Sequence, residues 1–215
     1  MNKYKCILFD LDGTLADTFP GILHSYQYAA RETGFPEPDE QIAGEVIGAP
    51  LAEVFRVRFG LSEELTKQAL YHYRHYYAEN GIHEAILYPG MKDTLAKLKQ
   101  EGYLLAVTTL KKEAFAKEML KSLGVSEYFD VILGMNDSDT ATKADIVKKA
   151  LAILETQNDE AVLVGDSSYD AIGAEQANVD FIAVTYGFGY KSVEDVVGNK
   201  ARAVIATTTG LFDVI

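Results

Sequence analysis

Residues 4–15 have the sequence YKCILFDLDGTL, and they decide the fold. The apolar run predicts a short buried strand that ends in two carboxylates, Asp10 and Asp12. Both side chains point the same way in extended backbone because they are two residues apart, and Gly13 allows a sharp turn after them. Two like charges raise the cost of ionising each other, and a divalent cation that prefers oxygen ligands, such as Mg²⁺, relieves that cost. The alternative at this point is an Asp-Gly turn that merely follows a strand.

The composition is that of a soluble globular chain, with 215 residues, 48% of them hydrophobic and 24% charged. This length allows one α/β domain or a core domain with a smaller insert. A net charge of −12 argues against nucleic acid or an anionic membrane as the main partner, although a metal and a few lysines would still permit an anionic small substrate. The sequence has no bilayer-length apolar run and no signal-peptide pattern, and its single cysteine, Cys6, falls inside the predicted strand. We therefore expect a cytoplasmic protein.

A helical segment follows the first strand. Helical spacing and cap signals predict helices over 18–34, 41–47, 51–59 and 62–80. Gly48-Ala49-Pro50 is either a loop that reaches toward a site or a plain turn between two helices. No stretch between residues 16 and 84 alternates like a strand. The sequence thus predicts a helical domain at 16–84, inserted into a core domain of 1–15 and 85–215.

The remainder of the chain alternates between strand and helix patterns. Further strands are predicted at 103–108, 130–133, 161–164, 181–184 and 203–205. Helices are predicted between them, at 91–102, 112–123, 143–154 and 169–177. This alternation predicts an α/β fold with a Rossmann-like parallel sheet and helices on both faces. Ligands of such sheets bind beyond the carboxyl ends of the strands.

Polar residues follow several of these strands. Thr108 and Thr109 place two hydroxyls at one strand end, either for a ligand or as a helix cap. Asp166 and Asp170 are four residues apart across a strand-to-helix junction, and capping explains one of them but hardly both. Lys143 begins a helix, and most lysines in such a place are exposed on the surface. The alternative is that it supplies a cation, besides the metal, to a phosphoryl site among the carboxylates.

Together these residues resemble the haloacid dehalogenase-like superfamily, along the whole chain. Its first motif, Asp-x-Asp-Gly-[Thr/Val], matches residues 10–14. Its second motif is a Ser or Thr that ends the second core strand, here Thr108, and its third is a helix-starting lysine, here Lys143. Its fourth motif, Gly-Asp-x-x-x-Asp, matches residues 165–170. The helical insert resembles the smaller cap of this family, and Tyr186-Gly187-Phe188-Gly189 resembles a late segment of the phosphoglycolate phosphatase-like branch.

The resemblance implies a role for each motif residue. Asp10 would be the nucleophile that forms an aspartyl-phosphate, and Asp12 would protonate the leaving oxygen and then deprotonate the attacking water. Mg²⁺ would be held by the Asp10 side chain, the Asp12 backbone carbonyl and Asp166. Lys143 would neutralise the nucleophile and the phosphoryl group. Asp170 would not bind the metal itself but would orient Lys143 or a metal-bound water.

The resemblance also implies contacts to substrate. Thr108 and backbone amides near Gly13 would bind phosphoryl oxygens, with Thr109 as a further substrate-binding residue. Two residues depart from the family pattern: Thr109 stands where Asn or Ser is common, and Ala144 stands where many relatives have Pro. Neither change removes a charge or a nucleophile.

Other chemistries of the superfamily fit this sequence less well. A dehalogenase has no need of an acid at Asp12, and a phosphonoacetaldehyde hydrolase needs a cap lysine where the insert offers only Lys67, beside Glu63 and Glu64. A β-phosphoglucomutase-like mutase keeps the second aspartate and is the main alternative, with a nucleotidase or pyrophosphatase also open. His72 and His75 could share a metal, but a helix that packs its aromatic residues against neighbours is the better interpretation.

We therefore expect a Mg²⁺-dependent phosphatase that acts on a small phosphate monoester, with phosphoglycolate favoured. Its partner would be a small phosphorylated metabolite, with no nucleic acid and no membrane. The protein would be a monomer or homodimer. A purely binding or regulatory module is disfavoured because all four motifs are intact.

Overall fold

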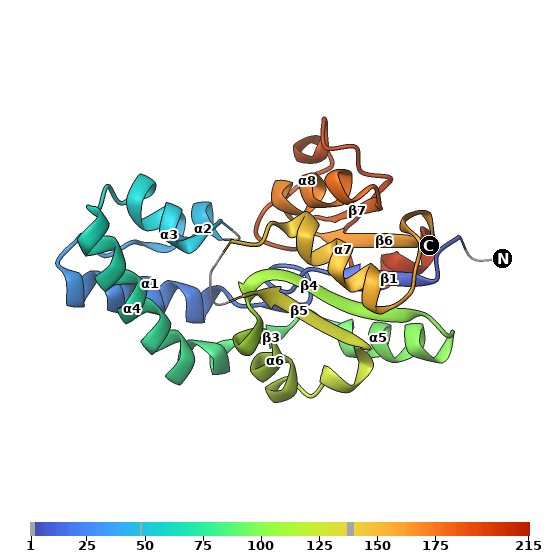
Figure 1. Cartoon of the computed structure of the whole chain (residues 1–215), viewed down its shortest axis with the longest axis horizontal. Coiled ribbons are helices and arrows are strands. Elements are labelled where there is room, and N and C mark those ends of the chain that lie inside the picture. Colours follow the sequence, from blue (N-terminus) through green and yellow to red (C-terminus); the bar gives the residue numbers. More distant parts are fainter. Residues whose placement is uncertain (1–2, 48, 137–139) are drawn as a thin grey trace. The chain divides into compact units, whose positions relative to one another are not determined.

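A computed structural model describes residues 3–47, 49–136 and 140–215. The chain separates into two compact units (Figure 1). One consists of Met1–Asp17 and Leu87–Ile215, and the other is Thr18–Ile86. The sequence predicted a helical insert at 16–84, so each predicted boundary lies two residues before the boundary of the smaller unit. The role of the helical unit as a cap stays a prediction.

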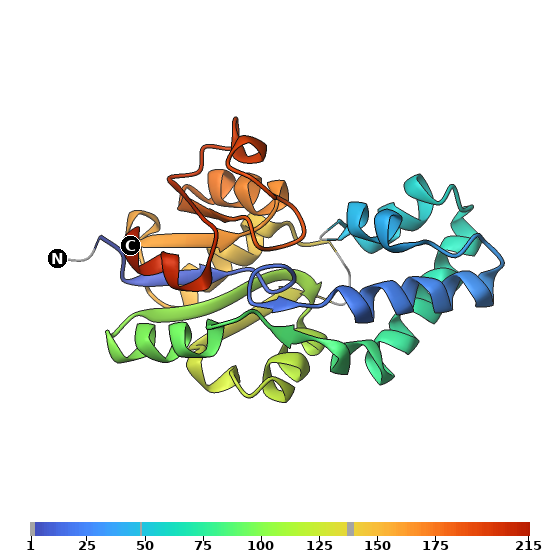
Figure 2. The same ribbon diagram turned by 180° about the vertical axis from the view of Figure 1, so that it is seen from behind.

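The larger unit is built on a six-stranded sheet in the order β5-β4-β1-β6-β7-β8, and every neighbouring pair is parallel. The strands are β1 Cys6–Phe9, β4 Leu104–Lys112, β5 Val131–Met135, β6 Ala161–Gly165, β7 Asp180–Val184 and β8 Ala203–Ile205. Helices cover both faces, with α7 and α8 on one side and α5 and α6 on the other (Figures 1 and 2). These helices are α5 Met91–Gln100, α6 Glu113–Ser122, α7 Lys143–Ile153 and α8 Ser168–Ala177. The predicted α/β fold with a parallel sheet is confirmed.

Five 3-10 turns complete the helical elements of the chain's described residues: η2 Gly81–Glu84, η3 Ser126–Tyr128, η4 Asn158–Glu160, η5 Glu194–Val196 and η6 Thr208–Asp213. All but η2 belong to the larger unit. None of the helices in the described residues combines the length and apolar composition that a membrane crossing requires.

Strand β1 positions the site because it lies in the middle of the sheet. All four of its residues are buried, and its last residue, Phe9, is in register with Val107 of β4 and Val164 of β6. Burial of each such apolar side chain contributes about 1.5–3 kcal/mol, so the strand is strongly held in this register. The residue after Phe9, Asp10, is thereby brought to the carboxyl edge of the sheet, between the ends of two neighbouring strands.

The helical unit contains α1 Phe19–Thr33, α2 Glu40–Val46, α3 Leu51–Glu53, a π-helical turn η1 Val54–Arg58 and α4 Glu63–Glu79. Helix α1 ends where predicted, at Gly34 with φ +81°. Its Tyr26 ring packs 4.8 Å from the Tyr73 ring of α4 and 5.5 Å from the Phe55 ring. Tyr73 of α4 thus serves helix packing, as the sequence suggested, whereas Tyr71 is exposed.

Two sequence predictions were wrong in detail. Residues Ala16–Asp17 form a short strand, β2, which pairs with β3 (Ile86–Leu87), although no strand was expected between residues 16 and 84. Two residues are too few to show alternation. Strand β4 continues to Lys112, where a helix was expected to begin, because a register shift against β5 between Thr108 and Lys112 lengthens it. Of the predicted loop Gly48-Ala49-Pro50, Gly48 lies outside the described residues.

Candidate active site

Lys143 joins two carboxylates at the carboxyl edge of the sheet. Its Nζ lies 2.6 Å from Asp10 Oδ1 and 2.6 Å from Asp170 Oδ1. Lys143 is only 5% exposed, so the alternative of an ordinary surface lysine is wrong. Its position is fixed by a capping box at the start of α7, in which Thr142 and Asp145 each bond the other's backbone N–H.

Asp170 contacts the start of helix α8 as well as Lys143. Its Oδ2 accepts hydrogen bonds from the backbone N–H and the hydroxyl of Ser167, which caps α8. Both carboxylate oxygens are therefore bonded, one to the cap and one to Lys143. The capping interpretation of the sequence is correct for Asp170, but it accounts for only one of its two contacts.

Two glycines leave room for this arrangement. A Cβ at Gly165 would lie 2.4 Å from the Asp170 carboxyl carbon, and a Cβ at Gly173 would lie 2.4 Å from Cγ of Lys143. Gly165 belongs to the fourth motif, which its contact explains. Gly173 was not identified from the sequence, because a glycine inside a helix gives no sign of what passes over it.

Asp166 is held by the segment Tyr186–Gly189. Its Oδ2 accepts the backbone N–H groups of Phe188 at 2.7 Å and Gly189 at 2.9 Å. A Cβ at Gly187 would lie 2.1 Å from the carbonyl oxygen of Gly13, so the segment passes close to the first motif. The sequence suggested only a family resemblance for this segment, and the structure shows that it directs one oxygen of Asp166.

Hydroxyl groups line the same edge. The hydroxyls of Thr14 and Thr108 are buried and have no hydrogen-bond partner among the described residues. Buried polar groups normally have partners, so these two hydroxyls, one at the end of the first motif and one just after the part of β4 that pairs with β1, can each serve a polar ligand bound there. Thr109 is also buried, but its Oγ1 accepts the backbone N–H of Lys111 instead.

The sequence analysis missed Lys111, which bonds Asp12. Its Nζ lies 2.6 Å from Oδ1 and 2.8 Å from Oδ2 of Asp12. The two side chains are only 8% and 12% exposed. A usable signal was available, because a lysine just beyond Thr108-Thr109 lies where the chain passes over the carboxyl edge of the sheet. The longer β4 and its register shift could not be read from the sequence.

Burial and mutual repulsion determine the charge state of this cluster. Burial raises the pKa of Asp10, the ammonium of Lys143 opposes that rise, and the carboxylates of Asp170, Asp12 and Asp166 add to it. Burial lowers the pKa of Lys143, but Asp10 and Asp170 outweigh burial and raise it above its usual value. Burial and then the charge of Asp170 raise the pKa of Asp166. The lysine therefore stays cationic, while the carboxylates need further positive charge to ionise together.

The donor set suits a hard divalent cation. Carboxylate oxygens of Asp10, Asp166 and Asp170 lie within 4.8 Å of one another, and all three residues are buried. The site has two more carboxylates than ammonium groups when all are ionised: Asp10, Asp12, Asp166 and Asp170 against Lys111 and Lys143. Hydrogen bonds occupy both oxygens of Asp170, so Asp10 and Asp166 are the better ligands. The residues fit an ion such as Mg²⁺.

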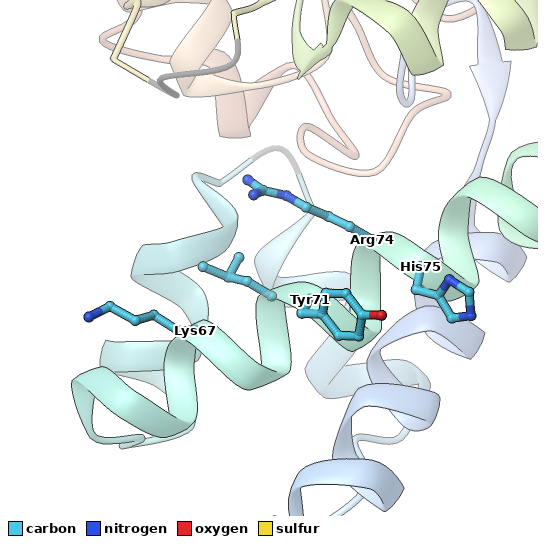
Figure 3. A pocket seen from close by; sticks show the side chains of 5 residues that line it. Lys67, Tyr71, Arg74 and His75 are labelled. Carbon is cyan, nitrogen blue, oxygen red and sulfur yellow. The ribbon is translucent and has the colours of Figure 1, made fainter.

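A separate hollow lies on the helical unit, along one face of α4 (Figure 3). Its volume is about 460 Å³, and it is lined by Lys67, Leu70, Tyr71, Arg74 and His75. The rings of Tyr71 and His75 are stacked, and Lys67 pairs with Glu63 at 2.9 Å, as the sequence suggested for that exposed lysine. The residues predicted for the active site do not line this hollow.

The chain is similar to several known proteins along most of its length. Residues 7–184 match the family described as haloacid dehalogenase-like hydrolase. The chain is 36% identical over 210 residues to tyrosine-protein kinase PtkA of Mycobacterium bovis, covering 97% of this chain and 70% of that one. It is 34% identical over 188 residues to a 5'-nucleotidase of Pseudomonas aeruginosa (87% and 85% covered). It is also 33% identical over 225 residues to a phosphoglycolate phosphatase of Vibrio vulnificus (99% and 96% covered).

A solved structure gives the same result. A predicted phosphatase from Clostridium acetobutylicum superposes on the chain with a TM-score of 0.91 at 33% identity, covering 99% of this chain and 98% of the other. The four motifs predicted this family from the sequence, and the prediction is confirmed. The chain belongs to the haloacid dehalogenase-like hydrolases.

Proposed function

We propose that the chain is a Mg²⁺-dependent phosphatase that hydrolyses a small phosphate monoester through an aspartyl-phosphate intermediate. The observation that carries the proposal is the buried contact between Asp10 and Lys143, within a carboxylate cluster at the carboxyl edge of the sheet. A phosphoryl group is anionic and would be repelled by a carboxylate nucleophile. The ammonium of Lys143 offsets that repulsion, so the Asp10 carboxylate can attack phosphorus.

In the first half of the reaction, an oxygen of Asp10 attacks phosphorus and the bond from phosphorus to the leaving oxygen breaks. Lys143 fixes the orientation of Asp10 through the bond to Oδ1 and offsets the charge of the incoming phosphoryl group. Asp12 must be protonated at this stage, with one oxygen turned away from Lys111, and it gives that proton to the leaving oxygen. The hydroxyls of Thr14 and Thr108 gain the hydrogen-bond acceptors that they lack among the described residues.

In the second half, water attacks the phosphorus of the aspartyl-phosphate and Asp12 takes its proton. Inorganic phosphate leaves and the Asp10 carboxylate is restored. Asp10, Asp166 and the backbone carbonyl of Asp12 would hold Mg²⁺, which when bound supplies positive charge to the phosphoryl oxygens. Asp170 keeps Lys143 in place throughout, because its other oxygen is anchored to Ser167.

Phosphoglycolate is the favoured substrate. The relative named phosphoglycolate phosphatase aligns with nearly the whole length of both chains, and the Tyr186–Gly189 segment resembles that branch. The 5'-nucleotidase relative keeps nucleoside monophosphates as an alternative, and pyrophosphate and sugar-phosphate isomerisation are further alternatives. We also propose a cytoplasmic monomer or homodimer whose partner is a small phosphorylated metabolite, without nucleic acid or membrane.

The proposal is tested by phosphate release from phosphoglycolate, nucleoside monophosphates, sugar phosphates and pyrophosphate, with Mg²⁺ and then with chelator. We expect Mg²⁺-dependent release from at least one of them. Substrate labelled with ³²P should also leave acid-stable label on the chain after rapid quenching. Conversion of a sugar 1-phosphate to its 6-phosphate without release would favour the mutase. Release that survives chelation would contradict the proposed metal dependence.

A further inference from the structure

Lys111 is a buried cation next to the residue that must serve the leaving group. It donates to both oxygens of Asp12, at 2.6 and 2.8 Å, and its side chain is 8% exposed. The motif assignments give it no role. A buried ammonium without a nearby anion is strongly destabilising. The groups that surround Lys111 during the reaction must therefore keep its charge compensated.

The local backbone is built to place this lysine. Strand β4 shifts register against β5 between Thr108 and Lys112, and a bulge of this kind changes the direction of a side chain. The hydroxyl of Thr109 accepts the backbone N–H of Lys111 at 3.1 Å. A Cβ at Gly134 of β5 would lie 2.4 Å from the carbonyl oxygen of Lys111, so only a glycine lets β5 approach there.

The proposed role of Asp12 would alter its contact with Lys111 when substrate binds. Asp12 must turn at least one oxygen toward the leaving oxygen, and both of its oxygens are bonded to Lys111 beforehand. The ion pair between Lys111 and Asp12 weakens when that oxygen turns away, and an anion on the leaving group would take the place of the lost contact. Two hydrogen bonds in series put Nζ within about 5–6 Å of the leaving oxygen. An anionic group one or two bonds beyond that oxygen is therefore within its reach.

We infer that Lys111 is a specificity-determining residue that selects substrates whose leaving group carries a second anion next to the ester oxygen. The carboxylate of phosphoglycolate and the second phosphate of pyrophosphate both have this chemistry, whereas the hydroxyl of a sugar or a nucleoside does not. The inference rests on the proposed phosphatase function and makes it more specific. Removal of Lys111 should therefore lower the preference for anionic leaving groups, and not activity in general.

The test compares two substrates of similar size, phosphoglycolate and ethyl phosphate, which differ in the carboxylate. We expect the wild-type ratio of kcat/KM for phosphoglycolate over ethyl phosphate to be at least about 10, and Lys111→Met to lower that ratio by about 10- to 100-fold, the effect of one charge-assisted hydrogen bond. Lys111→Arg should restore much of the ratio. Lys117→Met, which removes an exposed lysine paired with Glu113, is the matched control and should leave the ratio unchanged. The pyrophosphate arm shows whether the second anion is a phosphate instead of a carboxylate.

Three outcomes would overturn the inference. An equal loss of kcat/KM for both substrates in Lys111→Met would mean that the lysine acts only through Asp12 or through the fold. Hydrolysis confined to neutral leaving groups would remove the inference and leave the phosphatase standing. No hydrolysis of any substrate would overturn the proposed function itself, and the inference with it. If Lys111→Met does not fold, Lys111→Gln keeps an N–H donor without the charge and carries the same test.

Discussion

At the scale of single residues, the site depends on side chains with two contacts each. Asp170 caps α8 through Ser167 and holds Lys143 through its other oxygen, so a helix start and a buried ammonium share one carboxylate. Asp166 likewise gives one oxygen to the amides of Phe188 and Gly189. The chemistry is therefore fixed by hydrogen bonds that also hold the fold together.

Asp10→Asn should abolish turnover while the protein stays folded. The amide cannot form the aspartyl-phosphate, so we expect kcat to fall by at least about 10³-fold. The free energy of unfolding should change little, because the change loses the charged contact with Lys143 but also removes one of several mutually repelling carboxylates. Kinetics and urea unfolding measure both effects, with Asp213→Asn as a surface control. Near-normal rates in Asp10→Asn would contradict the mechanism.

At the scale of elements, the helical unit depends on a close backbone contact. Gly21 of α1 faces Gly81 of η2, and a Cβ at Gly21 would lie 2.1 Å from the Gly81 carbonyl oxygen. Gly44 of α2 differs, because a Cβ there meets nothing closer than a Phe19 ring atom at 3.9 Å. The two glycines therefore make a matched pair.

Gly21→Ala should destabilise the helical unit and Gly44→Ala should not. The first change forces backbone apart and is expected to cost about 1–3 kcal/mol of unfolding free energy. The second replaces a helical glycine in open space and should gain up to about 1 kcal/mol. Thermal or urea unfolding of both variants measures the difference. Equal effects of the two changes would show that the contact is unimportant.

Sheet strand β7 begins with Asp180, whose ion pair with Lys3 and hydrogen bond from Tyr4 tie it to the segment before β1. Burial raises the pKa of Asp180, but its bonds from Lys3 and Tyr4 outweigh burial and lower it. A carboxyl whose folded-state pKa is lowered adds stability above its unfolded pKa of about 4, and loses it as pH falls through the folded value.

Asp180→Asn should therefore lower stability at pH 7 but not in acid. Because the pair is partly exposed, the expected loss is only about 0.5 kcal/mol, and it should shrink as pH falls below about 4. Urea unfolding at pH 7 and at pH 3 measures this, with Asp213→Asn as the control. A difference that persists unchanged at low pH would mean that the charge of Asp180 is not responsible.

The elements also show what the sequence can predict. Helix α1 ends at Gly34 and β1 ends before Asp10 as expected, because a glycine stop and an apolar run are local signals. The end of β4 was misjudged because its last residues depend on a register shift against β5, which is a property of two strands. The place of Lys111 just after Thr108-Thr109 was a usable signal, but its contact with Asp12 depends on the same register shift. Local chemistry could be predicted, whereas contacts that depend on pairing between distant segments could not.

At the scale of the whole molecule, the reactivity of the single cysteine, Cys6, can be used to measure how often the core opens. Cys6 lies in β1, is fully buried, and burial raises the pKa of its thiol to about 12. The thiolate is the reactive form, so the native protein should resist thiol reagents.

Labelling of Cys6 should therefore follow unfolding of the larger unit. We expect slow reaction with a disulfide reagent in buffer, complete reaction of one thiol per chain in urea, and a rate that falls when Mg²⁺ and inorganic phosphate are added. Mass spectrometry of timed samples measures it. Rapid stoichiometric labelling in buffer would mean that β1 opens far more easily than a central strand should.

The central place of β1 also has a consequence for synthesis. The strand is made before both of its neighbours in the sheet, because its last residue pairs with residues 107 and 164. At roughly 5–20 residues per second, its second neighbour emerges about 8–30 s after it does. During that time the apolar strand has at least one edge without its partner strand, while the helices of residues 18–86 can already fold on local contacts. The nascent chain is therefore expected to need chaperone protection for β1, mainly during translation.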